Sequence, residues 1–236
     1  MIKLSPRLQI VYDMIPQCHS MADVGCDHGY LTIAALENNK ADFAISMDVN
    51  KGPLNRAKDN IEAEGLSDKA SFRLSDGLRE LHPGEAEVIC ICGMGGALIK
   101  RIIKNDLSIA KSVEALIIEP QSEYFELRDF LKNEGFVIID EELTMEENKI
   151  YPIIKLCYEQ DVNKRPTYSA ADLTYGPVII KKVPELLKIL LDKNKSEYST
   201  ILCGLEEIQP KSDAIKNRQE ELKRELQIIS EIENLL

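Results

Sequence analysis

The stretch MADVGCDHGYL, residues 21–31, decides the fold that this sequence predicts. A short apolar run ends at Val24, glycines and acids follow, and the pattern from Tyr30 onward is that of a helix. Glycine permits a tight turn and lets a ligand approach the backbone closely, and the start of a helix offers free N–H groups to that ligand. We therefore expect a buried strand, a ligand-binding turn and a helix in succession.

Strand and helix signals alternate on both sides of this stretch. Strands are expected at residues 21–24, 43–48, 70–76, 87–93, 115–120, 136–146 and 150–159. Helices are expected from Pro6, with Ser5 as the cap, and at residues 30–38, 53–64, 97–104 and 123–134. This alternation predicts an α/β fold, a Rossmann-like parallel sheet with helices on both faces. Because no helix separates the last two strands, they should form an antiparallel hairpin at the edge of a seven-stranded sheet.

The pattern changes near residue 160, so we expect one domain over residues 1–160, and a linker with a C-terminal helical hairpin over residues 161–236. In the hairpin, mainly apolar residues recur at spacings of four and three in the first helix and of seven in the second. They are Leu187, Leu191, Asn194, Tyr198, Ile201, Leu205 and Ile208, then Ile215, Leu222, Ile229 and Leu236. Pro210 should end the first helix, and Ser212 or Asp213 should cap the second. These spacings predict a coiled-coil hairpin; pairing of the second helix with another copy of the chain is the alternative.

Charge and composition exclude several classes of protein. The chain of 236 residues is 44% hydrophobic and carries a net charge of −11. Residues 161–236 hold 12 Lys and Arg against 13 Asp and Glu, so nearly all of the acidity lies in residues 1–160. That balance argues against a general nucleic-acid-binding surface but leaves room for a local basic patch. No stretch is long and apolar enough for a membrane span or a signal peptide, so we expect a cytoplasmic protein without membrane contact.

Six cysteines are present, and none belongs to a C-x-x-C pair. Cys90 and Cys92 lie two residues apart in an expected strand and therefore point to the same face. A structural zinc site needs two closely spaced pairs of ligands, so no metal is expected. We expect all six cysteines to be reduced, buried side chains.

Three aspartates end successive strands of the predicted sheet. Asp23, Asp48 and Asp76 would meet at its carboxyl edge, where ligands bind in open α/β sheets. A dinucleotide site would show G-x-G-x-x-G, whereas here Gly25 and Gly29 are separated by three residues that include an acid. Carboxylates disfavour a pyrophosphate and favour a ligand with an amino group and a sulfonium, so the pattern indicates S-adenosyl-L-methionine. Helix capping is the alternative role for Asp48 and Asp76.

The fourth strand ends in ICGMGG, residues 91–96, where a planar base could lie flat against backbone atoms. The residues of this wall are Gly93, Met94, Gly95 and Gly96. The helix that follows begins with a basic cluster, which would contact phosphates or form only a solvated helix face. The cluster consists of Lys100, Arg101 and Lys104.

Five stretches together resemble the bacterial tRNA (adenine-22-N1)-methyltransferase family, called TrmK. They are LSPRL (residues 4–8), DVGCDHGYL (23–31), DVNKGPL (48–54), SDGL (75–78) and GMGG (93–96). The resemblance covers the whole chain, including the C-terminal hairpin. It implies a class I methyltransferase domain, S-adenosyl-L-methionine as methyl donor and tRNA as acceptor. The resemblance is weakest at EPQ, residues 119–121, and it assigns no role to Glu119.

The motifs and the resemblance together indicate which residues bind the donor. They are Arg7, Asp23, Gly25, Asp27, His28, Gly29, Asp48, Val49, Asp76, Gly77, Gly93 and Met94. Asp48 would accept hydrogen bonds from the ribose hydroxyls, Asp76 would accept one from the adenine amino group, and Arg7 would pair with the donor's carboxylate.

Asp27, His28 and Tyr30 are the candidates for catalysis. N1 of adenine is already a nucleophile, so the role of Asp27 would be to stabilise the positive ring or to take an N6 proton. His28 would act as a base or hydrogen-bond the donor, and Tyr30 would stack on the target base. Asp27 as a plain turn residue and Tyr30 as a core residue are the structural alternatives. Substrate binding is assigned to Gly95, Gly96, Lys100, Arg101 and Lys104.

Two other functions fit the same motifs. A class I methyltransferase for a small molecule would use the hairpin to dimerise, and a non-catalytic nucleotide-sensing protein would use it as a docking arm. A tRNA methyltransferase would be a monomer whose hairpin contacts RNA through basic residues, with homodimerisation through the hairpin as the alternative. The C-terminal part as a whole, linker and hairpin together, offers these basic residues: Lys164, Arg165, Lys181, Lys182, Lys211, Lys216, Arg218, Lys223 and Arg224.

Overall fold

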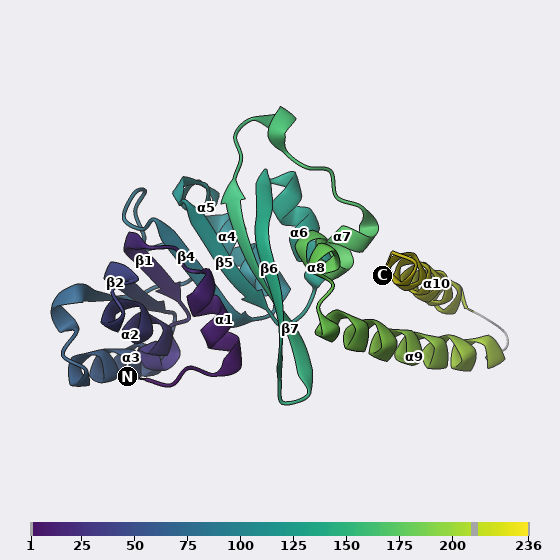
Figure 1. Ribbon diagram of the computed structural model, residues 1–236, viewed down its shortest axis with the longest axis horizontal. Coiled ribbons are helices and arrows are strands. Elements are labelled where there is room, and N and C mark those ends of the chain that lie inside the picture. Colours follow the sequence, from purple (N-terminus) through teal and green to yellow (C-terminus); the bar gives the residue numbers. More distant parts are fainter. Residues whose placement is uncertain (1, 209–211, 236) are drawn as a thin grey trace. The chain divides into compact units, whose positions relative to one another are not determined.

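The computed structural model describes residues 2–208 and 212–235. The chain forms two compact units, residues 1–167 and residues 168–236 (Figure 1). Three predicted positions lie outside the described residues: Pro210 as helix stop, Lys211 as RNA contact and Leu236 as a seam residue.

Unit 1 is built on a sheet of seven strands in the order β3-β2-β1-β4-β5-β7-β6. The strands are β1 Cys18–Val24, β2 Ala41–Asp48, β3 Ala70–Leu74, β4 Val88–Met94, β5 Ala115–Pro120, β6 Phe136–Glu146 and β7 Lys149–Tyr158. Neighbours from β3 to β5 are parallel, whereas β7 runs antiparallel to both β5 and β6. This sheet and its terminal hairpin confirm the predicted Rossmann-like fold.

Helices cover both faces of the sheet. They are α1 Pro6–Met14, α2 Tyr30–Glu37, α3 Lys51–Ala63, α4 Gly96–Asn105, α5 Leu107–Ser112 and α6 Tyr124–Asn133. In Figure 1, α1, α2 and α3 lie on one face, and α4, α5 and α6 lie on the other. A sheet covered on both faces needs side chains that tolerate burial on both, and all six residues of β5 are buried.

The first helix begins as predicted. Pro6 occupies the first helical position, and the Ser5 hydroxyl accepts a hydrogen bond from the Leu8 N–H at 3.4 Å. Val11 and Ile15 are buried in the core. α1 packs against α2, β5, β6 and β7. The contact between Arg7 and Glu119 places its first turn beside the carboxyl end of β5.

Two local features of unit 1 differ from expectation. β3 ends at Leu74, two residues earlier than predicted. The cause is a local turn in which the Ser75 hydroxyl donates to the Gly77 carbonyl at 2.9 Å and Gly77 adopts φ +69°. The short helix α5 was not predicted, since its six residues are too few to establish a periodicity.

Unit 2 is helical: α7 Ala170–Tyr175, α8 Pro177–Lys182, α9 Glu185–Glu207 and α10 Asp213–Glu233. The segment expected to be a linker contains the short helices α7 and α8; Ser169 and Asp172 form a capping box at the start of α7. α9 and α10 contact each other, which confirms the helical hairpin. Ser212 caps α10, as one of the two predicted caps, by accepting the Ile215 N–H at 3.4 Å.

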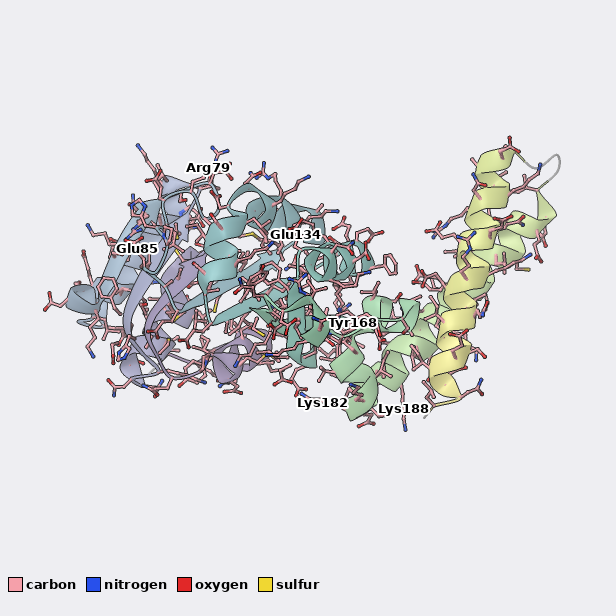
Figure 2. All side chains as sticks on the ribbon, turned by 90° about the horizontal axis from the view of Figure 1, so that it is seen from above. Arg79, Glu85, Glu134, Tyr168, Lys182 and Lys188 are labelled. Atoms are coloured by element: carbon pink, nitrogen blue, oxygen red, sulfur yellow. The ribbon has the colours of Figure 1, made fainter. Side chains whose placement is uncertain are left out.

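The predicted seam is buried at only some of its positions. Leu187 and Leu191 of α9 and Leu222 and Ile229 of α10 are buried. The prediction is wrong for Ile201 and Ile208, which are 37% and 43% exposed. Basic side chains lie on the outside of this unit; Lys182 and Lys188, labelled in Figure 2, are both exposed.

All six cysteines are free thiols. Cys18, Cys26 and Cys90 are buried as expected, but Cys203 of α9 is exposed, so the expectation of general burial is wrong there. Within residues 2–208 and 212–235, no helix has the length and apolar character needed to cross a bilayer. Within the same ranges, His, Cys, Asp and Glu side chains form no cluster of three or more that could hold a metal ion.

Candidate active site

The turn between β1 and α2 lies at the carboxyl edge of the sheet. The Gly25 and Cys26 N–H groups donate to the Met47 carbonyl at 2.8 and 3.1 Å, which ties the turn to β2. Gly25 has φ +80°, and a Cβ at this position would collide with the Met94 side chain. Glycine is favoured here mainly because φ lies in the left-handed region, where other residues are strained; the flexible Met94 side chain would also have to move. Asp27–Gly29 then form a single 3-10 turn before α2 begins.

His28 carries backbone strain at the centre of this turn. Its φ is +66°, a left-handed conformation that residues other than glycine rarely adopt. The Asn60 amide of α3 donates to the His28 carbonyl at 2.9 Å, and Arg56, one helical turn earlier, donates to the Asp27 carboxylate at 2.7 and 3.1 Å. Gly29 packs against the same helix with φ +67°. The turn is therefore held in its strained shape from α3.

Asp23 is buried at the end of β1 and is only 5% exposed. The Thr32 hydroxyl donates to the Asp23 carboxylate at 3.0 Å and lies 3.0 Å from the Ser46 hydroxyl. Burial raises the pKa of Asp23 to about 6, against the Thr32 hydrogen bond and with help from the Asp48 charge. The hydrogen bond from Thr32 offsets only part of the cost of burying the Asp23 charge. A cationic ligand beside this carboxylate would therefore bind favourably.

A cavity of about 120 Å³ lies between the ends of β1, β2 and β3 and the start of α4. Six predicted donor-binding residues line it: Gly25, Asp48, Val49, Asp76, Gly77 and Met94. The buried Asp48 accepts the Asn50 N–H at 2.7 Å through its Oδ1 atom. The N-cap of α3 is Asn50, and no side chain caps this helix. Asp48 therefore does not take the alternative role of helix cap; it bonds to the N-cap residue and lines the cavity.

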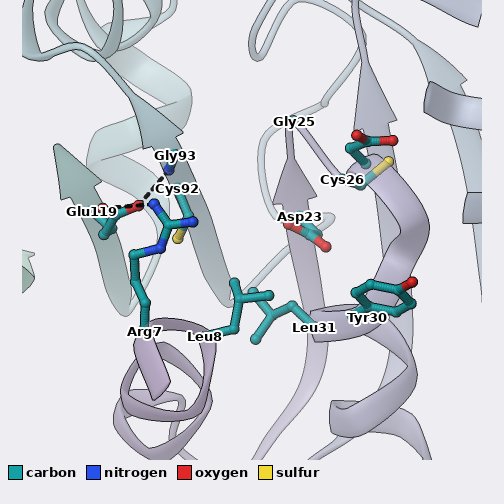
Figure 3. A pocket seen from close by; sticks show the side chains of 11 residues that line it. Arg7, Leu8, Asp23, Gly25, Cys26, Tyr30, Leu31, Cys92, Gly93 and Glu119 are labelled. Carbon is teal, nitrogen blue, oxygen red and sulfur yellow. Dashed lines mark hydrogen bonds and ion pairs between the residues drawn. The ribbon is translucent and has the colours of Figure 1, made fainter. Parts of the chain in front are cut away.

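A second cavity, of about 150 Å³, shares Gly25 with the first. Figure 3 shows its lining, which comes from α1, from β1 and the turn, from α2, and from the ends of β4 and β5. The residues are Arg7, Leu8, Asp23, Gly25, Cys26, Asp27, Tyr30, Leu31, Cys92, Gly93 and Glu119. The two cavities together follow the carboxyl edge from β3 to β5, as an elongated ligand lying across Gly25 would require.

Glu119 belongs to this site although sequence reasoning assigned it no role. It ends β5, is 1% exposed, and accepts the Gly93 N–H at 2.6 Å and an Arg7 N–H at 3.5 Å (Figure 3). Burial raises the pKa of Glu119, and the Arg7 charge and the Gly93 N–H oppose that shift. Arg7 also pairs with Glu146 of β6, with 3.1 Å between Nε and Oε2. Arg7 thus has two carboxylate partners within its own chain.

The three candidates for catalysis come together beside this cavity. Tyr30 and His28 are stacked, with ring centroids 5.3 Å apart and an interplanar angle of 14°. Tyr30 is 38% exposed and lines the cavity together with Asp27. Because the Asp27 carboxylate is engaged by Arg56, its contacts in the structure are those of a turn-holding residue.

Packing shapes the GMGG segment. Gly93 turns the chain with φ +75°, and Gly95 is the N-cap of α4. The buried Gly96 donates its N–H to the Ser122 carbonyl at 3.1 Å, and a Cβ on Gly96 would collide with that carbonyl. Gly96 therefore faces the segment that follows β5, and its lack of a side chain serves close packing.

The three basic residues predicted at the start of α4 have different surroundings. Arg101 pairs with Asp76 at 3.4 Å and lines the cavity that holds Asp48. The Lys100 ammonium lies 5.4 Å from the Phe130 ring centroid, and Lys104 is exposed. Arg101 and Lys104 are both exposed, and Lys104 lies at the C-terminal end of α4.

Comparisons with known proteins agree with this architecture. A family model described as a methyltransferase domain matches residues 4–154. The tRNA (adenine(22)-N(1))-methyltransferase of Bacillus subtilis (strain 168) is 33% identical over 234 residues, which cover 98% of this chain and 97% of that protein.

Solved structures extend the similarity to the whole chain. The crystal structure of the B. subtilis m1A22 tRNA methyltransferase TrmK has a TM-score of 0.90 at 30% identity, covering 98% of this chain and 99% of that one. Streptococcus pneumoniae Sp1610 in complex with S-adenosyl-L-methionine has a TM-score of 0.83 at 32% identity, with coverages of 98% and 99%. Because the similarity includes the C-terminal hairpin as well as the methyltransferase domain, the chain belongs to the TrmK family of tRNA (adenine(22)-N(1))-methyltransferases.

Proposed function

We propose that this protein transfers a methyl group from S-adenosyl-L-methionine to N1 of adenosine 22 in tRNA. The observation that carries this proposal is the pair of cavities that share Gly25 along the carboxyl edge of the sheet. Aspartates line one cavity, as a nucleoside requires, and buried carboxylates line the other, as a cationic amino acid requires. The B. subtilis relative is named for this reaction, and the S. pneumoniae structure contains this donor.

The side chains at this edge fit the donor group by group. Asp48 would accept hydrogen bonds from the ribose hydroxyls, and Asp76 would accept one from the adenine amino group. Asp23 and Glu119 would compensate the ammonium and sulfonium charges, since both are buried and raised in pKa by burial. Arg7 would pair with the donor's carboxylate by exchanging one of its two partners within the chain.

The mechanism that we propose relies on alignment and electrostatics. The donor supplies an electrophilic methyl group on a sulfonium, and N1 of adenine attacks it in line without first losing a proton. Since N1 lies on the Watson–Crick edge, the base must be unpaired and turned out of any stack. Tyr30 and His28 would receive the base, and Asp27, held by Arg56, would keep them in place. Carboxylates at this edge would stabilise the positive charge that develops on the ring.

We place tRNA binding on the exposed basic residues of unit 2 and on Lys104 of α4, with Gly95 and Gly96 supporting the loop beside the base. The protein would act as a monomer in the cytoplasm, where its substrate is found. Sedimentation at micromolar concentration should give a mass near 26.6 kDa. A mass of twice that value would favour the homodimer instead.

A methylation assay tests the proposed function directly. Unmodified tRNA that carries adenosine at position 22 should accept tritiated methyl groups, and nuclease digestion should release 1-methyladenosine. The same tRNA with guanosine at position 22 should stay unlabelled. Label in small molecules and none in tRNA would overturn the proposal, as would a flat calorimetric titration of the folded protein with S-adenosyl-L-methionine.

A further inference from the structure

Unit 1 has a larger groove beside the donor cavities. Its volume is about 750 Å³, within the roughly 300–1,000 Å³ that is typical of ligand sites. Arg7, Leu8 and Tyr30 line both this groove and the cavity shown in Figure 3, so the two adjoin. The rest of the lining consists of Lys3, Leu4, Ser5, Pro6, Gln121, Glu146, Glu147 and Tyr151.

The antiparallel hairpin supplies the outer wall of this groove. In the β5–β7 register, Leu116 pairs with Leu156 and Ile118 with Ile154, so the first residues of β7 lie beyond the carboxyl end of β5. Tyr151 is among them, and the Arg7 guanidinium lies 5.2 Å from its ring centroid. The hairpin at the end of the sheet thus brings an aromatic wall to the edge where the methyl group is transferred.

The chemistry of the lining favours a base over a phosphate. Tyr30 and Tyr151 offer aromatic rings on which a base can stack. Glu146 and Glu147 place two carboxylates at the groove, and the cations Lys3 and Arg7 balance their charge. The lining therefore has no net positive charge that would favour a phosphate over a base. The occupant that fits is the base of an unpaired nucleotide, with its phosphates outside the groove.

Gln121 is a neutral side chain of this lining that can both donate and accept hydrogen bonds. It lies beside the GMGG segment. Its N–H donates to the Met94 carbonyl at 2.9 Å, which fixes its backbone next to that segment. The side chain is exposed and lines the groove. Within residues 2–208 and 212–235, its amide takes part in no hydrogen bond.

We infer that Gln121 selects adenine by binding N6 and N7 of the target base, a role that rests on the proposed function. The reaction consumes the N1 lone pair, so the enzyme must recognise adenine without occupying N1. A glutamine amide can do this, because its oxygen accepts from the N6 amino group while its nitrogen donates to N7. Guanine presents acceptors at both O6 and N7, so the amide oxygen would face an acceptor and the pair would fail.

The test combines a side-chain change with a single-atom change in the substrate. The tRNA carries adenosine or 7-deazaadenosine at position 22; the second lacks the N7 acceptor. Wild type, Gln121→Leu and the control Gln160→Leu are compared by kcat/KM for methyl transfer. Gln160 is an exposed residue just beyond the far end of β7, at the opposite edge of the sheet.

We expect wild type and Gln160→Leu to lose about 2- to 10-fold in kcat/KM with 7-deazaadenosine, because the N7 hydrogen bond is lost while the N6 contact remains. Gln121→Leu loses both contacts, so it should be slowed by about 10- to 100-fold on adenosine and should scarcely distinguish the two substrates. Its Kd for S-adenosyl-L-methionine should stay within about twofold of wild type, which shows that the donor site is intact.

An equal penalty for 7-deazaadenosine in wild type and Gln121→Leu would overturn this role, because the N7 contact would then lie elsewhere. Unchanged kcat/KM of Gln121→Leu on adenosine would also overturn it. Failure of wild type to methylate the ordinary tRNA at all is a different result: it would refute the proposed function and this role with it.

Discussion

Asp23 shows at the scale of one residue how a ligand site lowers the stability of the free protein. Its pKa is raised by burial from 3.8 to about 6. Between these two values the folded chain keeps a proton that the unfolded chain has lost, so the free energy of unfolding falls as the pH rises through this window. Above about pH 6 this loss of stability is complete. The difference between the two pKa values corresponds to about 3 kcal/mol in the free energy of unfolding.

Asp23→Asn should therefore stabilise the protein at high pH while weakening donor binding. We expect the free energy of unfolding to rise by about 1–3 kcal/mol at pH 8 and to change little at pH 3.5, where Asp23 is protonated in the folded chain and mostly protonated in the unfolded chain. Urea titrations at the two pH values measure this, with the exposed Asp68→Asn as control. A gain of equal size at both pH values would show that the carboxylate charge is not the cause.

Asp27 has two possible roles, and its contact with Arg56 separates them. Because Arg56 binds the Asp27 carboxylate at 2.7 Å, we expect Asp27→Asn and Arg56→Gln to reduce kcat by factors that agree within about threefold. Both variants should retain binding of S-adenosyl-L-methionine in calorimetry. If Asp27→Asn is slower than Arg56→Gln by about 100-fold or more, Asp27 acts on the substrate and the positioning role is refuted.

At the scale of elements, the site depends on how closely α4 and α3 approach the strand ends. α3 supplies Arg56 and Asn60 to the strained turn, and the first turn of α4 packs against the segment that follows β5. Gly96 permits that approach because a side chain there would meet the Ser122 carbonyl. These contacts make the carboxyl edge rigid on both sides of Gly25.

Gly96→Ala should destabilise unit 1, because its Cβ would collide with backbone that cannot move freely. We expect a loss of about 1–3 kcal/mol in the free energy of unfolding, as for other overpacked positions. Gly204→Ala in α9 is the matched control: its Cβ would meet nothing within 4 Å, so it should stabilise its helix by up to about 1 kcal/mol. Denaturation followed by circular dichroism checks both, and a neutral Gly96→Ala would contradict the packing described here.

For the whole molecule, charge and function divide between the two units. The residues assigned to the donor all lie in unit 1, which holds most of the negative charge. Several basic side chains of unit 2 pair with acids of the same unit, such as Lys195 with Glu233 at 2.7 Å and Arg218 with Glu221 at 2.6 Å. Their charges are partly compensated before any RNA binds.

A chain of residues 1–167 should accordingly separate the two functions. We expect its Kd for S-adenosyl-L-methionine to stay within about twofold of the full chain, because the donor cavities belong to unit 1. Its kcat/KM for tRNA should fall by about tenfold or more, since the basic residues of unit 2 would be lost. Calorimetry and methyl transfer measure the two quantities, and undiminished activity on tRNA would show that unit 2 does not contact the substrate.

The sequence alone determined the sheet, its antiparallel end and the line of aspartates, because these follow from local periodicity and from strand ends that must meet at one edge. Glu119 could not be found in this way: its partner Arg7 is 112 residues distant, and no local pattern records such a contact. The same holds for Arg56 and Asn60, which look like ordinary surface residues of α3 until the turn is packed against them. Only the tertiary structure decided that Gly96 serves packing and that Gln121 and Tyr151 share a groove, because both depend on segments that meet only after the chain has folded.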